Sequence, residues 1–65
     1  MKIMVNGEAC NTEARTIADL CRELGLSQAK VATAKNGEFV AAKARTEAVL
    51  VEGDVIEIVS PRQGG

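Results

Sequence analysis

The sequence predicts an α+β domain of two layers, in which one helix packs across one face of a mixed sheet of four to five strands. Three observations predict this fold. Asn-Gly pairs occur at 6–7 and at 36–37, each between short segments typical of strands. One segment between these two hairpins has apolar residues at the spacing of one face of a helix. An alternating strand, "VIEIV", follows them.

Composition limits the size and the chemistry of the protein. The 65 residues allow one domain, and 46% hydrophobic with 26% charged residues is a globular balance. Phe39 is the only aromatic residue and the net charge is −1, so neither a basic surface nor stacking platforms are available to a nucleic acid. No apolar run approaches the roughly 20 residues of a membrane span, and "MKIMVNGE" turns polar too early for a signal peptide. We expect a cytoplasmic protein that binds neither nucleic acid nor membrane.

Few residues suited to catalysis are present. Histidine is absent, which removes the usual general base and the commonest metal ligand. Cys10 and Cys21 are the only cysteines, and without a secretory signal we expect both to be reduced. Cys21 is expected in the core and Cys10 half exposed, and neither has a CxxC or histidine partner that would suit it to sulfur chemistry. We expect no catalytic residue and no metal site.

Residues 1–12 predict the first hairpin. In "MKIMV", Ile3 and Val5 share one face, as in a half-buried strand. The Asn6-Gly7 pair favours a two-residue turn because both residues tolerate positive φ. "EACNT" is then the returning strand, short and at an edge of the sheet.

Residues 16–25 predict the helix. Four apolar residues follow the spacing of one helical stripe: Ile17, Leu20, Cys21 and Leu24. Thr16 is the expected N-cap, Asp19 completes a capping-box pattern, and Gly25 ends the helix in the left-handed conformation. A helix of about eight residues is too short to persist alone. It must therefore lie across a sheet.

The second hairpin consists of "KVATAK", the Asn36-Gly37 pair and "EFV". Residues 41–48 are rich in alanine and suit a helical turn, although nothing caps it clearly. "VLV" at 49–51 is a candidate for a further brief strand.

The last strand is "VIEIV", which follows a turn at "EGD". Glu57 should face water, which sends Ile56 and Ile58 inward. A proline then removes a backbone donor and ends the ladder, and "RQGG" after it has no apolar anchor. We expect a domain over residues 1–60 and a flexible tail over residues 61–65.

The whole pattern resembles the ubiquitin-like β-grasp domains and, more narrowly, the ThiS family, the sulfur carriers of thiamine biosynthesis. The resemblance rests on "MKIMVNGE", "TIADLCRELGL", "NGEFV", "EGDVIEIV" and the closing "QGG". "EGDVIEIV" with the final Gly-Gly is the most specific pair. The sequence departs from the family at Ala41 and Ala42, where members commonly carry Pro-Arg, and at Lys35, where many have an apolar residue. These departures bear on partner contacts or local packing and leave the tail unchanged.

The resemblance implies that the chain is a carrier and not an enzyme, with Gly65 as its modified residue. A separate ThiF-like adenylating enzyme would use ATP to convert the C-terminal carboxylate into an acyl-adenylate. A persulfide sulfur donor would then replace the adenylate with sulfur. The resulting thiocarboxylate would deliver its sulfur to a ThiG-like thiazole synthase. The carrier itself would bind no cofactor.

The chemistry of the terminus is consistent with this role. A terminal carboxyl with a pKa of about 3.3–3.7 is ionised in the cell, so it is a poor acyl electrophile but a competent nucleophile toward phosphorus. AMP supplies the leaving group that it lacks. Glycine suits the end of such a tail because a Cβ could clash with the walls of a narrow partner site.

Six further residues are predicted to contact partners: Arg62, Gln63, Gly64, Phe39, Val55 and Val59. The first three adjoin the reactive end. The other three are expected on the sheet face away from the helix, where an apolar patch would be an interaction surface. Plain edge packing is the alternative for these three.

Other functions remain open. The small subunit of molybdopterin synthase looks similar and also ends in Gly-Gly, but such chains are usually longer and richer in aromatic residues near the last strand. A ubiquitin-like modifier or interaction module would instead join Gly65 to a lysine. A small enzyme is disfavoured, because no nucleophile–base pair, metal-ligand cluster or glycine-rich phosphate loop is present in the sequence.

Overall fold

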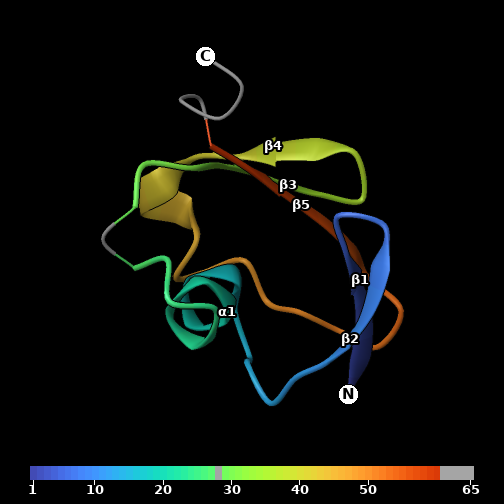
Figure 1. Cartoon of the computed structure of the whole chain (residues 1–65). Helices are drawn as coiled ribbons and strands as arrows, with labels where there is room; N and C mark the ends of the chain where they lie inside the picture. Colours follow the sequence, from blue (N-terminus) through green and yellow to red (C-terminus); the bar gives the residue numbers. More distant parts are fainter. Residues whose placement is uncertain (28, 61–65) are drawn as a thin grey trace.

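The structure, a computed structural model, describes residues 1–27 and 29–60. Its elements are β1 (Lys2–Val5), β2 (Glu8–Asn11), α1 (Ile17–Glu23), β3 (Ala32–Lys35), β4 (Glu38–Val40), the 3-10 turn η1 (Ala42–Ala44) and β5 (Val55–Val59). The five strands form one sheet, and α1 lies on one side of it (Figure 1). The two-layer α+β arrangement expected from the sequence is confirmed.

The sheet has the strand order β2-β1-β5-β3-β4. β1 and β5 run parallel, whereas β1 with β2, β3 with β4 and β3 with β5 are antiparallel. The sheet is therefore mixed, with β2 at an edge as predicted. The last strand, β5, lies at the centre of the sheet, between the two hairpins.

Both hairpin turns use the Asn-Gly pairs as predicted. Asn6 and Gly7 have φ values of 52° and 84°, and Asn36 and Gly37 have 51° and 87°. Two consecutive positive φ values are typical of the type I′ turn, whose twist matches that of the flanking strands. The local sequence therefore fixes both reversals of the chain.

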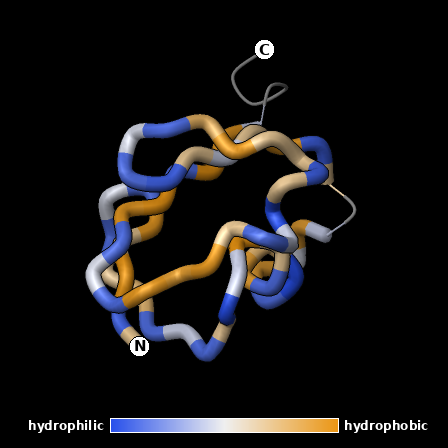
Figure 2. Tube along the Cα trace, turned by 180° about the vertical axis from the view of Figure 1, so that it is seen from behind, coloured by the Kyte–Doolittle hydropathy of each residue, from blue (hydrophilic) through white to orange (hydrophobic). Residues whose placement is uncertain are grey.

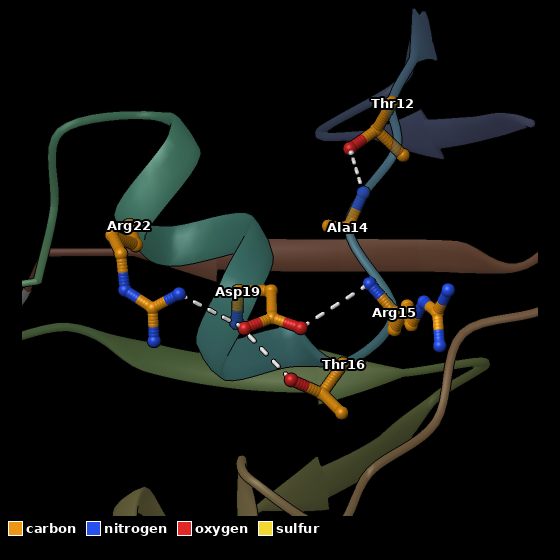
Figure 3. Close-up of polar contacts among 6 residues, drawn as sticks. All are labelled: Thr12, Ala14, Arg15, Thr16, Asp19 and Arg22. Atoms are coloured by element: carbon orange, nitrogen blue, oxygen red, sulfur yellow. Dashed lines mark hydrogen bonds and ion pairs between the residues drawn. The ribbon is translucent and has the colours of Figure 1, made fainter.

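The helix begins at its predicted cap. The Thr16 hydroxyl accepts a hydrogen bond from the backbone N–H of Asp19 at 3.1 Å, which satisfies one of the free donors of the first turn. The Asp19 carboxylate accepts from the N–H of Arg15 at 3.4 Å (Figure 3). Asp19 thus reaches back one residue beyond the N-cap, in a variant of the capping box.

The helix ends in a Schellman motif centred on Gly25, whose φ is 77°. The N–H of Gly25 donates to the carbonyl of Arg22 at 3.1 Å, and the N–H of Leu26 donates to that of Cys21 at 2.7 Å. The prediction that Leu24 belongs to the buried stripe is wrong, because it is 42% exposed. The helix has already ended at this residue, and Leu26 packs against the core after the turn.

The core lies between α1 and the inner face of the sheet. It consists of Ile3, Ala14, Ile17, Leu20, Cys21, Leu50, Ile56 and Ile58. In β5 the burial alternates, so Glu57 is exposed between two buried isoleucines, as predicted. All the large side chains of this core are aliphatic.

The segment between β4 and β5 forms the predicted helical turn but not the predicted strand. Val49 makes a single antiparallel bridge with Thr16, and Leu50 N–H donates to the carbonyl of Arg15 at 2.8 Å. The segment therefore pairs with the chain that enters α1 and not with the sheet. Since the helix begins at the next residue, the pairing cannot continue. Figure 2 shows the hydrophobic stretch of this segment, ahead of β5, where it passes the helix.

The expected division into a domain over residues 1–60 and a tail over residues 61–65 stays a prediction, because the tail lies outside the described residues. Within the part of the chain that the structure describes, no helix is long and apolar enough to cross a membrane.

Candidate functional site

The sheet face turned away from α1, here called the outer face, is the candidate docking surface. Along β5, Ile56 and Ile58 point into the core, so the alternating residues Val55, Glu57 and Val59 point outward. Val55 is 44% and Val59 57% exposed. Two large apolar side chains of the central strand are thus left in water.

Phe39 on β4 shares the outer face. It pairs with Ala34 of β3, which in turn pairs with Glu57 of β5, and paired residues point to the same side of a sheet. Phe39 is 73% exposed. The structure therefore places Phe39, Val55 and Val59 on one face, as expected, and their contact with a partner stays a prediction.

Three further apolar residues share the outer face with these side chains. By the strand register, Met4 lies beside Val55 and Ala32 beside Val59. We call the whole group the outer patch: Phe39, Val55 and Val59 with Met4, Ala32 and Ala34. An exposed apolar surface of this kind is typical of an interaction site. Glu57 gives it a negative charge between the two valines.

The predicted reactive end lies outside the described residues, and so do three of the predicted contact residues: Arg62, Gln63 and Gly64. Gly65 follows Val59 by six positions in the sequence. A segment of that length spans at most roughly 20 Å when extended. For a partner that both holds the outer patch and reacts at Gly65, this length sets the greatest distance between its reactive centre and the end of β5.

The two cysteines lie where the sequence predicted. Cys21 is 5% exposed in the core, and Cys10 is partly buried. Burial raises the pKa of the Cys21 thiol above its ordinary value, although the positive charge of Arg45 opposes this. A raised pKa disfavours the thiolate, which is the nucleophilic form. This environment does not favour sulfur chemistry at Cys21.

A polar depression of about 360 Å³ borders the start of α1 and contains Arg15, Asp19 and Arg22. Two of its charges are paired, since Arg22 Nη1 lies 3.0 Å from Asp19 Oδ1 (Figure 3). Glu13 and Glu23 also line it. Burial raises the pKa of Asp19. Hydrogen bonds with Arg15, Arg22 and Thr16 and the charge of Arg22 outweigh this effect, so the pKa of Asp19 lies below its ordinary value. Thr16 and Asp19 cap the helix, so the lowered pKa of Asp19 has a structural cause.

No group of three or more His, Cys, Asp or Glu residues that could hold a metal ion occurs among residues 1–27 and 29–60.

Asp54 is a buried polar residue that the sequence analysis did not identify. Expected only as part of a turn, it is 5% exposed. Its carboxylate accepts hydrogen bonds from the N–H of Val51 at 2.9 Å and from Asn36 Nδ2 at 3.0 Å, and Lys35 Nζ lies 3.8 Å away. Burial raises the pKa of Asp54, but these hydrogen bonds and the Lys35 charge outweigh it, so the pKa lies below its ordinary value.

This cluster gives Lys35 a structural role. Its ammonium group lies beside the buried carboxylate of Asp54. Only the strand register brings the turn after β3 to the turn before β5. Nothing in the local sequence around Asp54 indicates that contact.

A family model and a solved structure both match this chain to the same family, ThiS. The sequence model of the ThiS family matches residues 3–65. The chain is 28% identical in sequence to the thiamine biosynthesis protein ThiS from Geobacter metallireducens. The crystal structure of that protein matches the fold of this chain with a TM-score of 0.82, over the full length of both chains. That match confirms the predicted β-grasp fold.

A curated relative adds a second comparison. The chain is 38% identical over 66 residues to a thiazole synthase from Paramagnetospirillum magneticum. The match covers 100% of this chain and 20% of that protein. The chain therefore spans about a fifth of the length of this relative.

Proposed function

The chain belongs to the ThiS family of thiamine sulfur carriers, and from that premise we propose how it works. The carboxylate of Gly65 is the group that carries the sulfur, and the outer patch is the surface that docks the enzymes acting on it. The observation that carries this proposal is the family match through residue 65, which includes the Gly64-Gly65 pair.

The first step activates the carboxylate. An oxygen of the Gly65 carboxylate attacks the α-phosphorus of ATP on a ThiF-like adenylating enzyme, and pyrophosphate leaves. The product is an acyl-adenylate in which AMP is the leaving group. The ionised terminal carboxyl is suited to this attack because its pKa of about 3.3–3.7 leaves it deprotonated at neutral pH.

The second step introduces sulfur. The terminal sulfur of a cysteine persulfide attacks the acyl carbon, and AMP leaves. A thiol then cleaves the resulting acyl disulfide: the thiol sulfur forms a new disulfide, and the carrier keeps the other sulfur as a thiocarboxylate. The carrier ends with one oxygen replaced by sulfur and binds no cofactor.

The third step delivers the sulfur to a thiazole synthase. The curated relative supports this partner, because a protein named as a thiazole synthase contains a segment similar to the whole of this chain. In this proposal the thiocarboxylate sulfur is the nucleophile, and hydrolysis after transfer returns the Gly65 carboxylate. The chain is consumed and regenerated as a cosubstrate.

The outer patch has the composition that docking requires. Phe39 is exposed on β4, at an edge of the sheet, and Val55 and Val59 are exposed on β5, at its centre. Aromatic residues are enriched in protein interfaces, and Phe39 is the only one in the chain. Binding at this face would offset the entropy lost when the residues leading to Gly65 become ordered.

Intact-mass spectrometry tests the proposal. The carrier is incubated with ATP, the adenylating enzyme and a persulfide source, and we expect the mass gain of one sulfur minus one oxygen at Gly65. Reactions without ATP, and a chain lacking Gly65, are the controls and should show no gain. A larger adduct on a lysine of another protein would instead identify a modifier. A thiocarboxylate that supports molybdopterin synthase as its small subunit, but is not used by thiazole synthase, would identify the other carrier pathway.

A further inference from the structure

The last strand is longer than the strand that it pairs with on one side. β1 and β5 pair in parallel at only two register positions. β1 then ends because the chain turns back at Asn6-Gly7, while β5 continues to Val59. Within the described residues, no strand pairs with the later half of β5 on this side.

The side chain of Asn6 occupies this place. Its Nδ2 donates to the carbonyl oxygen of Ile58 at 2.9 Å, and its Oδ1 accepts from the N–H of Ile58, also at 2.9 Å. The backbone N–H of Asn6 donates to the carbonyl of Ile56 at 2.9 Å. A carboxamide offers the same donor and acceptor as a peptide group. One residue therefore extends the ladder by a further step, first with its main chain and then with its side chain.

The other hairpin holds the opposite end of β5 in a similar way. Asn36 Oδ1 accepts from the N–H of Val55 at 2.9 Å, and its Nδ2 donates to Asp54 at 3.0 Å. Asn36 has a φ of 51° and Asn6 a φ of 52°, in the left-handed region that asparagine tolerates well. Asn36 thus fixes the start of the last strand, and Asn6 fixes it near the end.

We infer that Asn6 is a positioning residue for the reaction at Gly65, acting through its two hydrogen bonds to Ile58. The inference rests on the proposed function, which places the chemistry seven residues beyond Ile58. Backbone that is ordered before binding loses less conformational freedom when Gly65 enters an enzyme. β3 still pairs with the other side of β5 as far as Val59, so loss of the Asn6 bonds would loosen one side of the strand end. That loosening would weaken productive binding while leaving the chemical step intact.

The test compares Asn6→Gly with the matched control Asn36→Gly. Glycine keeps the positive φ of each turn and removes the carboxamide. In the free carrier, Asn6→Gly should accelerate hydrogen exchange of the Ile58 amide, measured by NMR. In ATP-dependent activation it should raise KM for the carrier roughly 5- to 30-fold, with kcat little changed. Both variants should lower the thermal midpoint to a similar extent, but Asn36→Gly should leave KM unchanged.

Three results would overturn the inference: unchanged exchange at Ile58, unchanged KM despite faster exchange, or an equal rise of KM in Asn36→Gly. If Asn6→Gly does not fold, Asn6→Asp is measured in the same way, since it keeps the acceptor for the Ile58 N–H and loses the donor. A wild-type chain that is not activated rejects the proposed function and the positioning role together. The exchange measurement needs no enzyme and still shows whether Asn6 holds β5.

Discussion

Gly64 is the residue at which the proposed chemistry makes its sharpest steric demand. The residue before the reactive carboxylate must pass through the active site of the partner as extended backbone, and a side chain there meets the walls of that site. The core that stabilises the domain does not include position 64, because its residues all precede position 59. Activation and stability should therefore separate at this position.

We predict that Gly64→Leu lowers the rate of AMP-dependent activation by about 100-fold, the loss expected when a reacting group is displaced by about 1 Å. The thermal unfolding midpoint should stay nearly unchanged. Gly64→Ala should fall between wild type and Gly64→Leu. ATP–pyrophosphate exchange with the adenylating enzyme measures activation, and circular dichroism measures the midpoint. Full activation of Gly64→Leu would contradict the proposed role of the tail.

At the scale of the elements, α1 offers a matched pair of leucines. Leu20 is fully buried, whereas Leu24 is 42% exposed after the helix has ended. Leu20→Ala should lower the free energy of unfolding by about 2–5 kcal/mol, since it removes transfer energy and leaves a cavity. Leu24→Ala should cost less than about 1 kcal/mol.

Urea unfolding of both variants measures the difference. Because a domain of this size has little stability to lose, Leu20→Met serves as a folded reference that keeps most of the side-chain volume. Equal losses in Leu20→Ala and Leu24→Ala would contradict the burial of one side of α1 only.

The turn before β5 carries a prediction about pH. The folded-state pKa of Asp54 lies below its ordinary value, so the unfolded chain takes up this proton first as the pH falls. The contribution of Asp54 to stability is therefore complete above about pH 4 and is lost as the pH falls toward the folded-state pKa. Asp54→Asn should be less stable than wild type at neutral pH, and the two should converge in acid.

Urea unfolding of wild type and Asp54→Asn over a series of pH values tests this convergence. Asp19 also has a lowered pKa, so both proteins should retain some loss of stability in acid. A constant difference between the two proteins at every pH would show that the charge of Asp54 does not stabilise the fold.

The elements differ in how far the sequence predicted them, for physical reasons. The hairpin turns and both ends of α1 depend on local backbone chemistry at Asn6, Asn36, Thr16 and Gly25, so single residues indicated them. Leu24 was misplaced because stripe spacing continues past the point where a helix ends. The role of Asp54 depends on contacts between distant segments, which only the strand register brings together.

At the scale of the whole molecule, the domain is two-sided. The inner face of the sheet buries the aliphatic core against α1, and the outer face exposes the outer patch. Alternation in β5 predicted Val55 and Val59 on this face, and the fold added Met4, Ala32 and Ala34 by register. The residues beyond 60 that the sequence analysis assigned to partner contact lie outside the described residues. Their role stays a prediction.

The two-sided arrangement predicts that docking can be weakened without loss of stability. Phe39→Ala should raise the dissociation constant of the carrier for its adenylating enzyme roughly ten-fold or more, because exposed aromatic residues commonly dominate interfaces. Its thermal midpoint should change little, since the side chain is already 73% exposed.

Val49→Ala is the matched control for this prediction. Val49 is 58% exposed but belongs to the segment that bridges to Thr16, not to the sheet. Isothermal titration calorimetry with the adenylating enzyme measures both variants. Binding that is weakened by Phe39→Ala and kept by Val49→Ala would assign docking to the outer face. Phe39 contributes little to the core, so Phe39→Ala changes the outer face without unfolding the domain. Equal binding by both variants and wild type would therefore mean that the adenylating enzyme holds the carrier at another surface.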